Sequence, residues 1–223
     1  MPVNSLSATP LSLWATYYHI HRAQSISNGE PLLNKQGQPL GPTLTTQDWC
    51  RSALEGTVQI ADASGFQITY NFAGRGADAQ VDCSAFFPKL SANVLEKVNR
   101  VRFIASAALY GHGTEGMALV PYRTIAVDRT QIPIGSVIYI PQARGRTVTL
   151  PTGDRVIHDG YFFAADVGSA IQGNHIDVFL GTSRHNPFPF ITSTPNHPFQ
   201  AFLVQDPQIA QALHQLHRSP TTK

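Results

Sequence analysis

The chain has 223 residues, of which 42% are hydrophobic and 13% charged, and its formal net charge is +2. This length and apolar content are enough to bury a core in one large or two small domains, which excludes extensive disorder. No basic run is longer than a pair. Nucleic acid is therefore not expected as a partner, because duplex binding needs a dense cluster of Lys and Arg.

The N-terminal sequence, MPVNSLSATPLSLWATYYH, has neither a basic segment nor an apolar core of the kind found in secretory signals. We therefore expect no signal peptide within this chain. No apolar run approaches 18 residues, so a membrane-spanning helix is not expected either.

The first half of the chain mixes strands and helices. Aromatic and β-branched residues at 12–19 favour a strand, whereas the Gly, Pro, Asn and Ser of 25–43 favour a long loop. A capped helix is predicted over 45–56, followed by the strands TVQIAD and FQITYNFAG and by a short helix over 93–98.

From residue 101 onward, strands alternate with tight turns. The runs are RFIASAALY, YRTIAVD, SVIYIPQ, RTVTL, YFFAAD and HIDVFLG. Their short spacing favours a small barrel over a sheet with crossover helices. One helix is predicted near the C-terminus, at Pro207–Leu216.

Cys50 and Cys83 are the two cysteines, 33 positions apart, and no CxxC or nearby His pair completes a metal site. In an oxidising compartment the two cysteines would form a disulfide. In a reducing one they would remain as two buried free thiols. The sequence leaves both alternatives open.

The densest chemical signal is ADVGSAIQGNHIDVFLG, at 165–181. Asp166 ends an apolar strand, and Asp177 lies within the next strand between two apolar residues. Such a carboxylate is costly unless it is hydrogen-bonded or protonated, and a protonated carboxyl is what a glycosidic bond requires of its general acid. Taken alone, the pattern also fits a capping Asp166 and a solvent-facing Asp177.

Three motifs together resemble the 3D domain, named for three aspartates, of the lytic transglycosylase A family and of related cell-wall proteins of spore formers. The chain has TYY at 16–18 for the family's T-x-Y, IAVDRTQIPIGS at 125–136, and DVGSAIQGNHID at 166–177. The family's three aspartates correspond to Asp128, Asp166 and Asp177.

The resemblance implies a mainly β fold: a six-stranded double-psi β-barrel with a smaller inserted α/β subdomain and a C-terminal helix. We expect the barrel over 12–24 and 97–205, the inserted subdomain over 25–96, and the C-terminal helix and tail over 206–223.

The resemblance also implies a peptidoglycan lytic transglycosylase, which cleaves the MurNAc–GlcNAc β-1,4 bond and forms a 1,6-anhydro ring. Asp177 would act as general acid and then as base, and Asp166 would be the second catalytic residue. Asp128 would hold backbone or a cleft residue in place, and Glu55 either faces the cleft or is a helix-end surface carboxylate. The residues expected to bind substrate are Asp128, Thr16, Tyr17, Ser169, Gly173, His175 and Glu55.

The chain departs from the family pattern at Ser169, Gln172 and His175, where a glycine, a lysine and an arginine are usual, so we expect a less charged cleft. Two other functions fit the same barrel: an inverting glycoside hydrolase and a non-catalytic, expansin-like wall-binding module. The expected partner is the peptidoglycan glycan strand, bound by a monomer without cofactor or metal. The expected location is the periplasm, the cell wall or the extracellular space.

Overall fold

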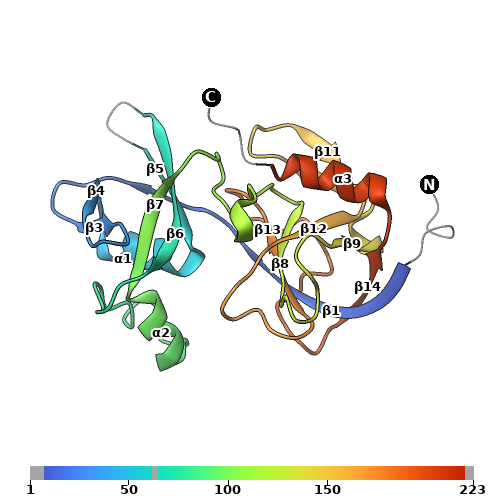
Figure 1. Ribbon diagram of the computed structural model, residues 1–223, viewed down its shortest axis with the longest axis horizontal. Helices are drawn as coiled ribbons and strands as arrows, with labels where there is room; N and C mark the ends of the chain where they lie inside the picture. Colours follow the sequence, from blue (N-terminus) through green and yellow to red (C-terminus); the bar gives the residue numbers. More distant parts are fainter. Residues whose placement is uncertain (1–7, 62–64, 219–223) are drawn as a thin grey trace. The chain divides into compact units, whose positions relative to one another are not determined.

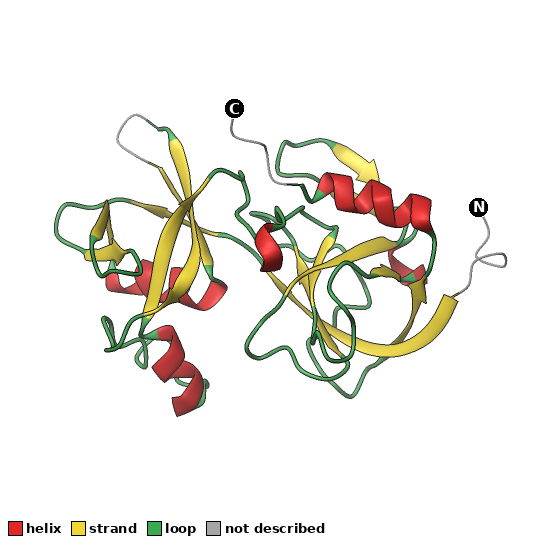
Figure 2. Cartoon of the chain, viewed as in Figure 1, coloured by secondary structure: helices red, strands yellow, loops and turns green. Residues whose placement is uncertain are grey.

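The computed structural model describes residues 8–61 and 65–218 (Figure 1). The chain forms two compact units: in the described part, residues 8–19 and 112–218 make up the first, and Ile20–Gly111 makes up the second. Strands dominate both units and the helices are short (Figure 2). No helix in the described part of the chain is long and apolar enough to cross a membrane. The predicted tail beyond 218, and the N-terminal segment before residue 8, lie outside the described residues.

The first unit is a closed barrel of six strands, in the order β1-β13-β8-β12-β9-β14. The strands are β1 (Ala8–Tyr18), β8 (Thr124–Ala126), β9 (Val137–Tyr139), β12 (Tyr161–Asp166), β13 (His175–Phe179) and β14 (Phe199–Val204). β1 pairs parallel with β13 and β8 parallel with β12, whereas the other neighbours are antiparallel. The predicted mainly β fold with a six-stranded barrel is confirmed.

The long, curved strand β1 pairs with a different neighbour along each half of its length (Figure 1). Its first half, residues 8–13, pairs antiparallel with β14, and its second half, residues 14–18, pairs parallel with β13. β1 therefore closes the barrel and extends along the strand that carries Asp177.

Two further elements follow the barrel strands. The run RTVTL, predicted as a barrel strand, instead supplies β10 (Thr147–Thr149), which forms a separate hairpin with β11 (Arg155–Ile157). Helix α3 covers Pro207–Leu216 as predicted, and the buried His217 after it bonds to the Thr124 hydroxyl on β8. The short turns of 3-10 helix are η2 (Thr114–Gly116) and η3 (Pro141–Ala143).

The second unit is a four-stranded sheet in the order β2-β5-β6-β7, with a two-stranded sheet, β3-β4, and two helices. Its elements are β2 (His21–Gln24), β3 (Glu30–Leu33), β4 (Pro39–Leu44), α1 (Thr46–Glu55), β5 (Thr57–Ala61), β6 (Gln67–Arg75), α2 (Ala92–Val98) and β7 (Val101–Ser106). The segment 25–43, predicted as a long loop, contains the β3-β4 hairpin.

The second unit is larger than the inserted subdomain predicted at 25–96, because strands at both of its ends join the same sheet. β2 pairs with β5, and β7 pairs with β6. Val101 and Phe103 of β7 pack into the core of this unit. The run RFIASAALY therefore belongs to the second unit and not to the barrel.

Helix α1 shows how the sequence fixes local structure in the second unit. Thr45 caps its first turn by accepting a hydrogen bond from the Asp48 N–H, and Gly56 ends it in the left-handed conformation. Cys50 on this helix forms a disulfide with Cys83. Of the two alternatives that the sequence left open, the structure has the disulfide.

Candidate active site

The paired strands β1 and β13 build the site on the outer face of the barrel. Side chains alternate between the two faces of a strand, so every second residue enters the core. The inward residues of the two strands are Leu13, Ala15, Ile176 and Val178. The residues between them share the outer face, where Trp14 lies opposite His175 and Thr16 opposite Asp177.

Asp166 reaches the same face from β12, on the far side of β8. Ala126 of β8 is paired with Asp177 on one side and with Asp166 on the other. A β-bulge between Ala164 and Asp166 shifts the register there, and such a bulge re-aims the side chain that follows it. The two carboxylates therefore lie on strands that flank β8, both level with Ala126.

Asp177 is half-buried in this setting and accepts one hydrogen bond, from the Thr16 hydroxyl to its Oδ1 at 2.7 Å. Burial raises the pKa of Asp177 to about 7; the Thr16 hydrogen bond opposes that rise, and the charge of Asp166 adds to it. A carboxyl with this pKa holds its proton below neutral pH and releases it easily, as general acid catalysis requires.

Asp166 is held more firmly in its ionised form. The Tyr18 hydroxyl donates to its Oδ2 at 2.7 Å, and the Val167 N–H donates to its Oδ1 at 2.8 Å. Burial raises the pKa of Asp166 to about 6, and these two hydrogen bonds oppose the rise. Between about pH 6 and 7, the favoured state is a charged Asp166 beside a protonated Asp177.

His175 lies on the same strand as Asp177, two residues before it, and shares its outer face. Its Nε2 is 2.8 Å from the Thr16 hydroxyl, and its ring stacks on Trp14 with centroids 3.6 Å apart and planes 7° apart. Burial lowers the pKa of His175, although a hydrogen bond to the Ala170 backbone opposes this. The imidazole is therefore neutral near pH 7.

Asp128 supports the backbone before β13. Its Oδ2 accepts from the Gly173 N–H at 2.8 Å, and its Oδ1 accepts from the N–H and the hydroxyl of Thr130. These hydrogen bonds lower the pKa of Asp128, the one from Gly173 most. Gly173 has a φ of +64°, in the region that favours glycine. These hydrogen bonds and the backbone conformation of Gly173 give both residues a structural role in the turn that leads to β13.

Two residues expected at the site, Tyr17 and Ser169, are not brought to the carboxylates by any contact in the described part of the chain. Tyr17 is 37% exposed, and the alternation along β1 places it on the face opposite to Thr16. Ser169 lies exposed in the turn after Asp166. Glu55 ends α1 in the second unit, and its part in substrate binding stays a prediction.

Tyr18 and Trp14 contact the site residues and were missed at the level of sequence. The signal was present, because Tyr18 and Trp14 lie two residues on either side of Thr16 and so share its face. In the T-x-Y motif, the tyrosine that corresponds is Tyr18, not its neighbour Tyr17.

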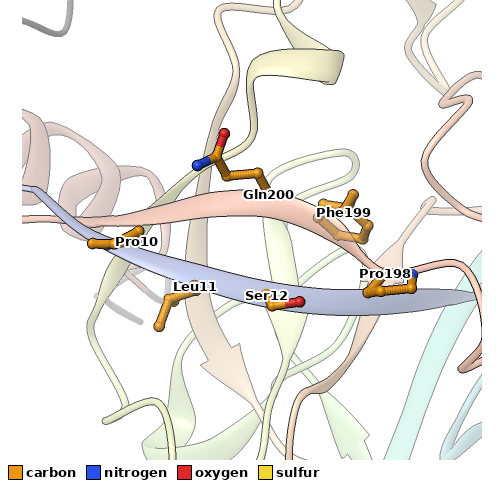
Figure 3. Close-up of a pocket in the computed structure, with 6 residues that line it drawn as sticks. All are labelled: Pro10, Leu11, Ser12, Pro198, Phe199 and Gln200. Atoms are coloured by element: carbon orange, nitrogen blue, oxygen red, sulfur yellow. The ribbon is translucent and has the colours of Figure 1, made fainter.

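No group of three His, Cys, Asp or Glu side chains that could hold a metal occurs among the described residues. A shallow pocket lies along the antiparallel pair β1-β14 (Figure 3), before the part of β1 that carries Thr16. Its lining residues are Pro10, Leu11, Ser12, Pro198, Phe199 and Gln200. The lining contains no carboxylate, so the pocket is separate from the acid pair.

Residues 123–186 match the family model described as the 3D domain. This segment is similar to 3D domains. All three aspartates of the motif fall inside it, and it supplies β8, β9, β12 and β13 of the barrel. No curated protein matches the chain.

Solved structures share the fold over most of the chain. Escherichia coli MltA with bound chitohexaose has a TM-score of 0.56 at 17% identity, covering 87% of this chain and 72% of its own. Neisseria gonorrhoeae MltA gives 0.56 at 13% identity, with coverage of 88% and 72%. A membrane-bound lytic murein transglycosylase from Agrobacterium tumefaciens gives 0.55 at 14% identity, with coverage of 93% and 78%. The chain thus shares the fold of these proteins.

Proposed function

We propose that the protein is a peptidoglycan lytic transglycosylase that cleaves the MurNAc–GlcNAc β-1,4 bond. The observation that carries the proposal is the pair Asp166 and Asp177, two carboxyl groups flanking β8 with raised and unequal pKa values. Structural similarity supports the reaction class, since the proteins that share this fold include lytic transglycosylases and one of them binds chitohexaose.

In the first step, protonated Asp177 donates its proton to the glycosidic oxygen. The bond between that oxygen and C1 of MurNAc breaks, the GlcNAc end leaves as an alcohol, and positive charge develops at C1. The pKa of about 7 suits this step, because Asp177 is still protonated near neutral pH and is a strong enough acid to donate.

In the second step, the Asp177 carboxylate takes the proton of the C6 hydroxyl of the same MurNAc. The C6 oxygen bonds to C1, which closes the 1,6-anhydro ring and returns Asp177 to its acid form. Leaving and attacking oxygens share one face of the sugar, so one carboxyl serves both steps without water. Ordinary glycosidases instead use two carboxylates that flank the bond.

Asp166 acts by its charge in this proposal. Ionised Asp166 stabilises the positive sugar and raises the proton affinity of Asp177. The Tyr18 and Val167 hydrogen bonds stabilise that charge. The glycan strand of the bacterial wall is the proposed partner, which places the protein in the periplasm, the wall or the extracellular space.

The deciding experiment is mass spectrometry of muropeptides released from purified sacculi, with Asp177→Asn as the inactive control. A transglycosylase releases fragments that end in 1,6-anhydro-MurNAc, one water lighter than the reducing ends that a hydrolase makes. Reducing ends would identify a hydrolase, the reaction class of the inverting glycoside hydrolase kept as an alternative. Binding to insoluble sacculi without any soluble product would identify a wall-binding module.

A further inference from the structure

The Thr16 hydroxyl lies between two groups that compete for its single proton. Its Oγ1 is 2.7 Å from Asp177 Oδ1 and 2.8 Å from His175 Nε2. A hydroxyl donates one hydrogen bond, so at any moment Thr16 donates either to the carboxylate or to the imidazole.

The neutral imidazole of His175 carries its one hydrogen on either ring nitrogen. The stacked Trp14 ring keeps the imidazole plane in the orientation that turns Nε2 toward Thr16. With the hydrogen on Nδ1, the ring presents the lone pair of Nε2 to the Thr16 hydroxyl, and this is the tautomer on which the proposal rests.

This arrangement links the hydroxyl of Thr16 to the ionisation of Asp177. While the Thr16 hydroxyl donates to His175, Thr16 Oγ1 accepts a hydrogen bond from protonated Asp177. This arrangement favours the acid form of Asp177. When Asp177 gives up its proton, the hydroxyl rotates toward the new carboxylate. The rotation breaks no covalent bond, and the only proton that is transferred is the one that Asp177 loses and later regains.

We propose that His175 is a positioning residue which competes with Asp177 for the Thr16 hydroxyl proton and so keeps Asp177 in its acid form until the glycosidic bond is protonated. The proposal rests on the proposed function of Asp177. It gives His175 a role other than the substrate contact expected from the sequence.

The other titratable groups around Asp177 are few in the described part of the chain. β12 contributes Asp166, and β1 contributes Tyr18, whose hydroxyl bonds to Asp166. β8 places the uncharged Ala126 opposite Asp177, and Asp128 beyond it bonds to the turn at Gly173. Replacing His175 or Thr16 leaves these groups in place, so a change in the titration of Asp177 reports on the hydroxyl.

The test is a 13C NMR titration of the Asp177 carboxyl in the full chain without substrate, with the signal assigned by its loss in Asp177→Asn. His175→Phe keeps a ring against Trp14 but cannot accept from Thr16, so the hydroxyl serves the carboxylate alone. We expect the pKa of Asp177 to fall, by about a tenfold change in its protonation equilibrium, the size of one hydrogen bond to a charged group. Thr16→Val removes the donor and should raise the pKa instead.

His175→Gln is the matched control, because its amide oxygen reaches the Nε2 position and accepts from Thr16 without titrating near neutral pH. It should restore the wild-type titration of Asp177. If His175→Phe does not fold, His175→Asn replaces it, since its shorter amide does not reach Thr16. An unchanged or higher pKa of Asp177 in the Phe or Asn variant would overturn the proposal.

The two levels of the proposal fail separately. If the wild-type protein releases no anhydro-muropeptides, the proposed function is wrong, and the titration still decides whether His175 controls Asp177. If the product is found but the pKa of Asp177 does not change when His175 is replaced, then His175 only supports the strand. In active variants, the alkaline limb of the pH–rate profile should move in the same direction as the titration.

Discussion

The Tyr18 hydroxyl donates a hydrogen bond of 2.7 Å to Oδ2 of Asp166, although the two residues are 148 positions apart. This contact ties the strand at the start of the barrel to the bulged end of β12. It also stabilises the ionised form of the carboxyl that is proposed to face the positive sugar.

Tyr18→Phe should move the acidic limb of the pH–rate profile to higher pH. The variant removes a donor that lowers the pKa of Asp166 from the value burial alone would give, so Asp166 ionises only at higher pH. The measurement is the rate of muropeptide release from pH 4 to 9. Tyr17→Phe is the matched control, since Tyr17 lies on the opposite face, and an equal shift there would contradict the assignment.

Asp166→Asn should move the alkaline limb to lower pH and slow the reaction. The charge of Asp166 raises the pKa of Asp177, so the acid loses its proton earlier without it. The acidic limb assigned to Asp166 should disappear in the same profile. An alkaline limb that stays in place would mean that the two carboxyls are not coupled.

Asp177→Asn should abolish activity, with a loss of at least about 10²–10⁴-fold. The same variant should also be more stable than the wild type in alkaline solution. The folded pKa of Asp177, about 7, lies above its ordinary value, so the folded state binds a proton that the unfolded chain releases near pH 4. The stability contributed by this proton is present at acidic pH and is lost as the pH rises through 7. At pH 8 the Asn variant should therefore melt at least about 2 °C above the wild type. A lower melting temperature at pH 8 would show that the ionised carboxylate is stabilising.

Asp128→Ala should reduce thermal stability and activity together without moving either limb of the pH–rate profile. The variant leaves the Gly173 N–H and Thr130 without their acceptor, which loosens the turn before β13. Asp154→Ala is the control, because that carboxylate accepts from Thr152 in an exposed hairpin turn. A shift of a pH limb in Asp128→Ala would mean that Asp128 acts on the acid pair directly.

The double variant Cys50→Ser/Cys83→Ser should destabilise the second unit by roughly 3–4 kcal/mol, the chain-entropy value for a loop of this length. The titration of Asp177 in the barrel should be unchanged, which serves as the internal control. Non-reducing mass spectrometry of the wild type should show one linked peptide and a chain two protons lighter than the reduced form. Free thiols in protein prepared under oxidising conditions would contradict the disulfide.

The sequence located the acid pair but not its geometry. The motif at 166–177 identified Asp166 and Asp177, because glycines and carboxylates at fixed spacing are visible in a string of letters. The bulge after Ala164, which turns Asp166 to the same face as Asp177, depends on pairing with β8 and leaves no local signature. The alternation from Thr16 along the strand already favours Tyr18 over Tyr17 as the residue on the site's face.

Domain boundaries were harder to predict for a related reason. The strand run of β7 resembles the barrel strands in composition, and hydrophobic periodicity does not tell which sheet a strand will join. Its place was settled by long-range packing of Phe103 with residues such as Trp49 and Val58, which sequence patterns cannot show.

The order of the strands along the chain determines when the site of Asp177 can form during protein synthesis. Thr16 and Asp177 are separated by 161 positions, and the whole second unit lies between them. At ordinary rates of synthesis, Thr16 leaves the ribosome about 10–30 s before its partner. Until β13 has been made and paired with β1, Asp177 has neither its hydroxyl donor nor its buried setting. A nascent chain that already carries its complete second unit is therefore still without an acid.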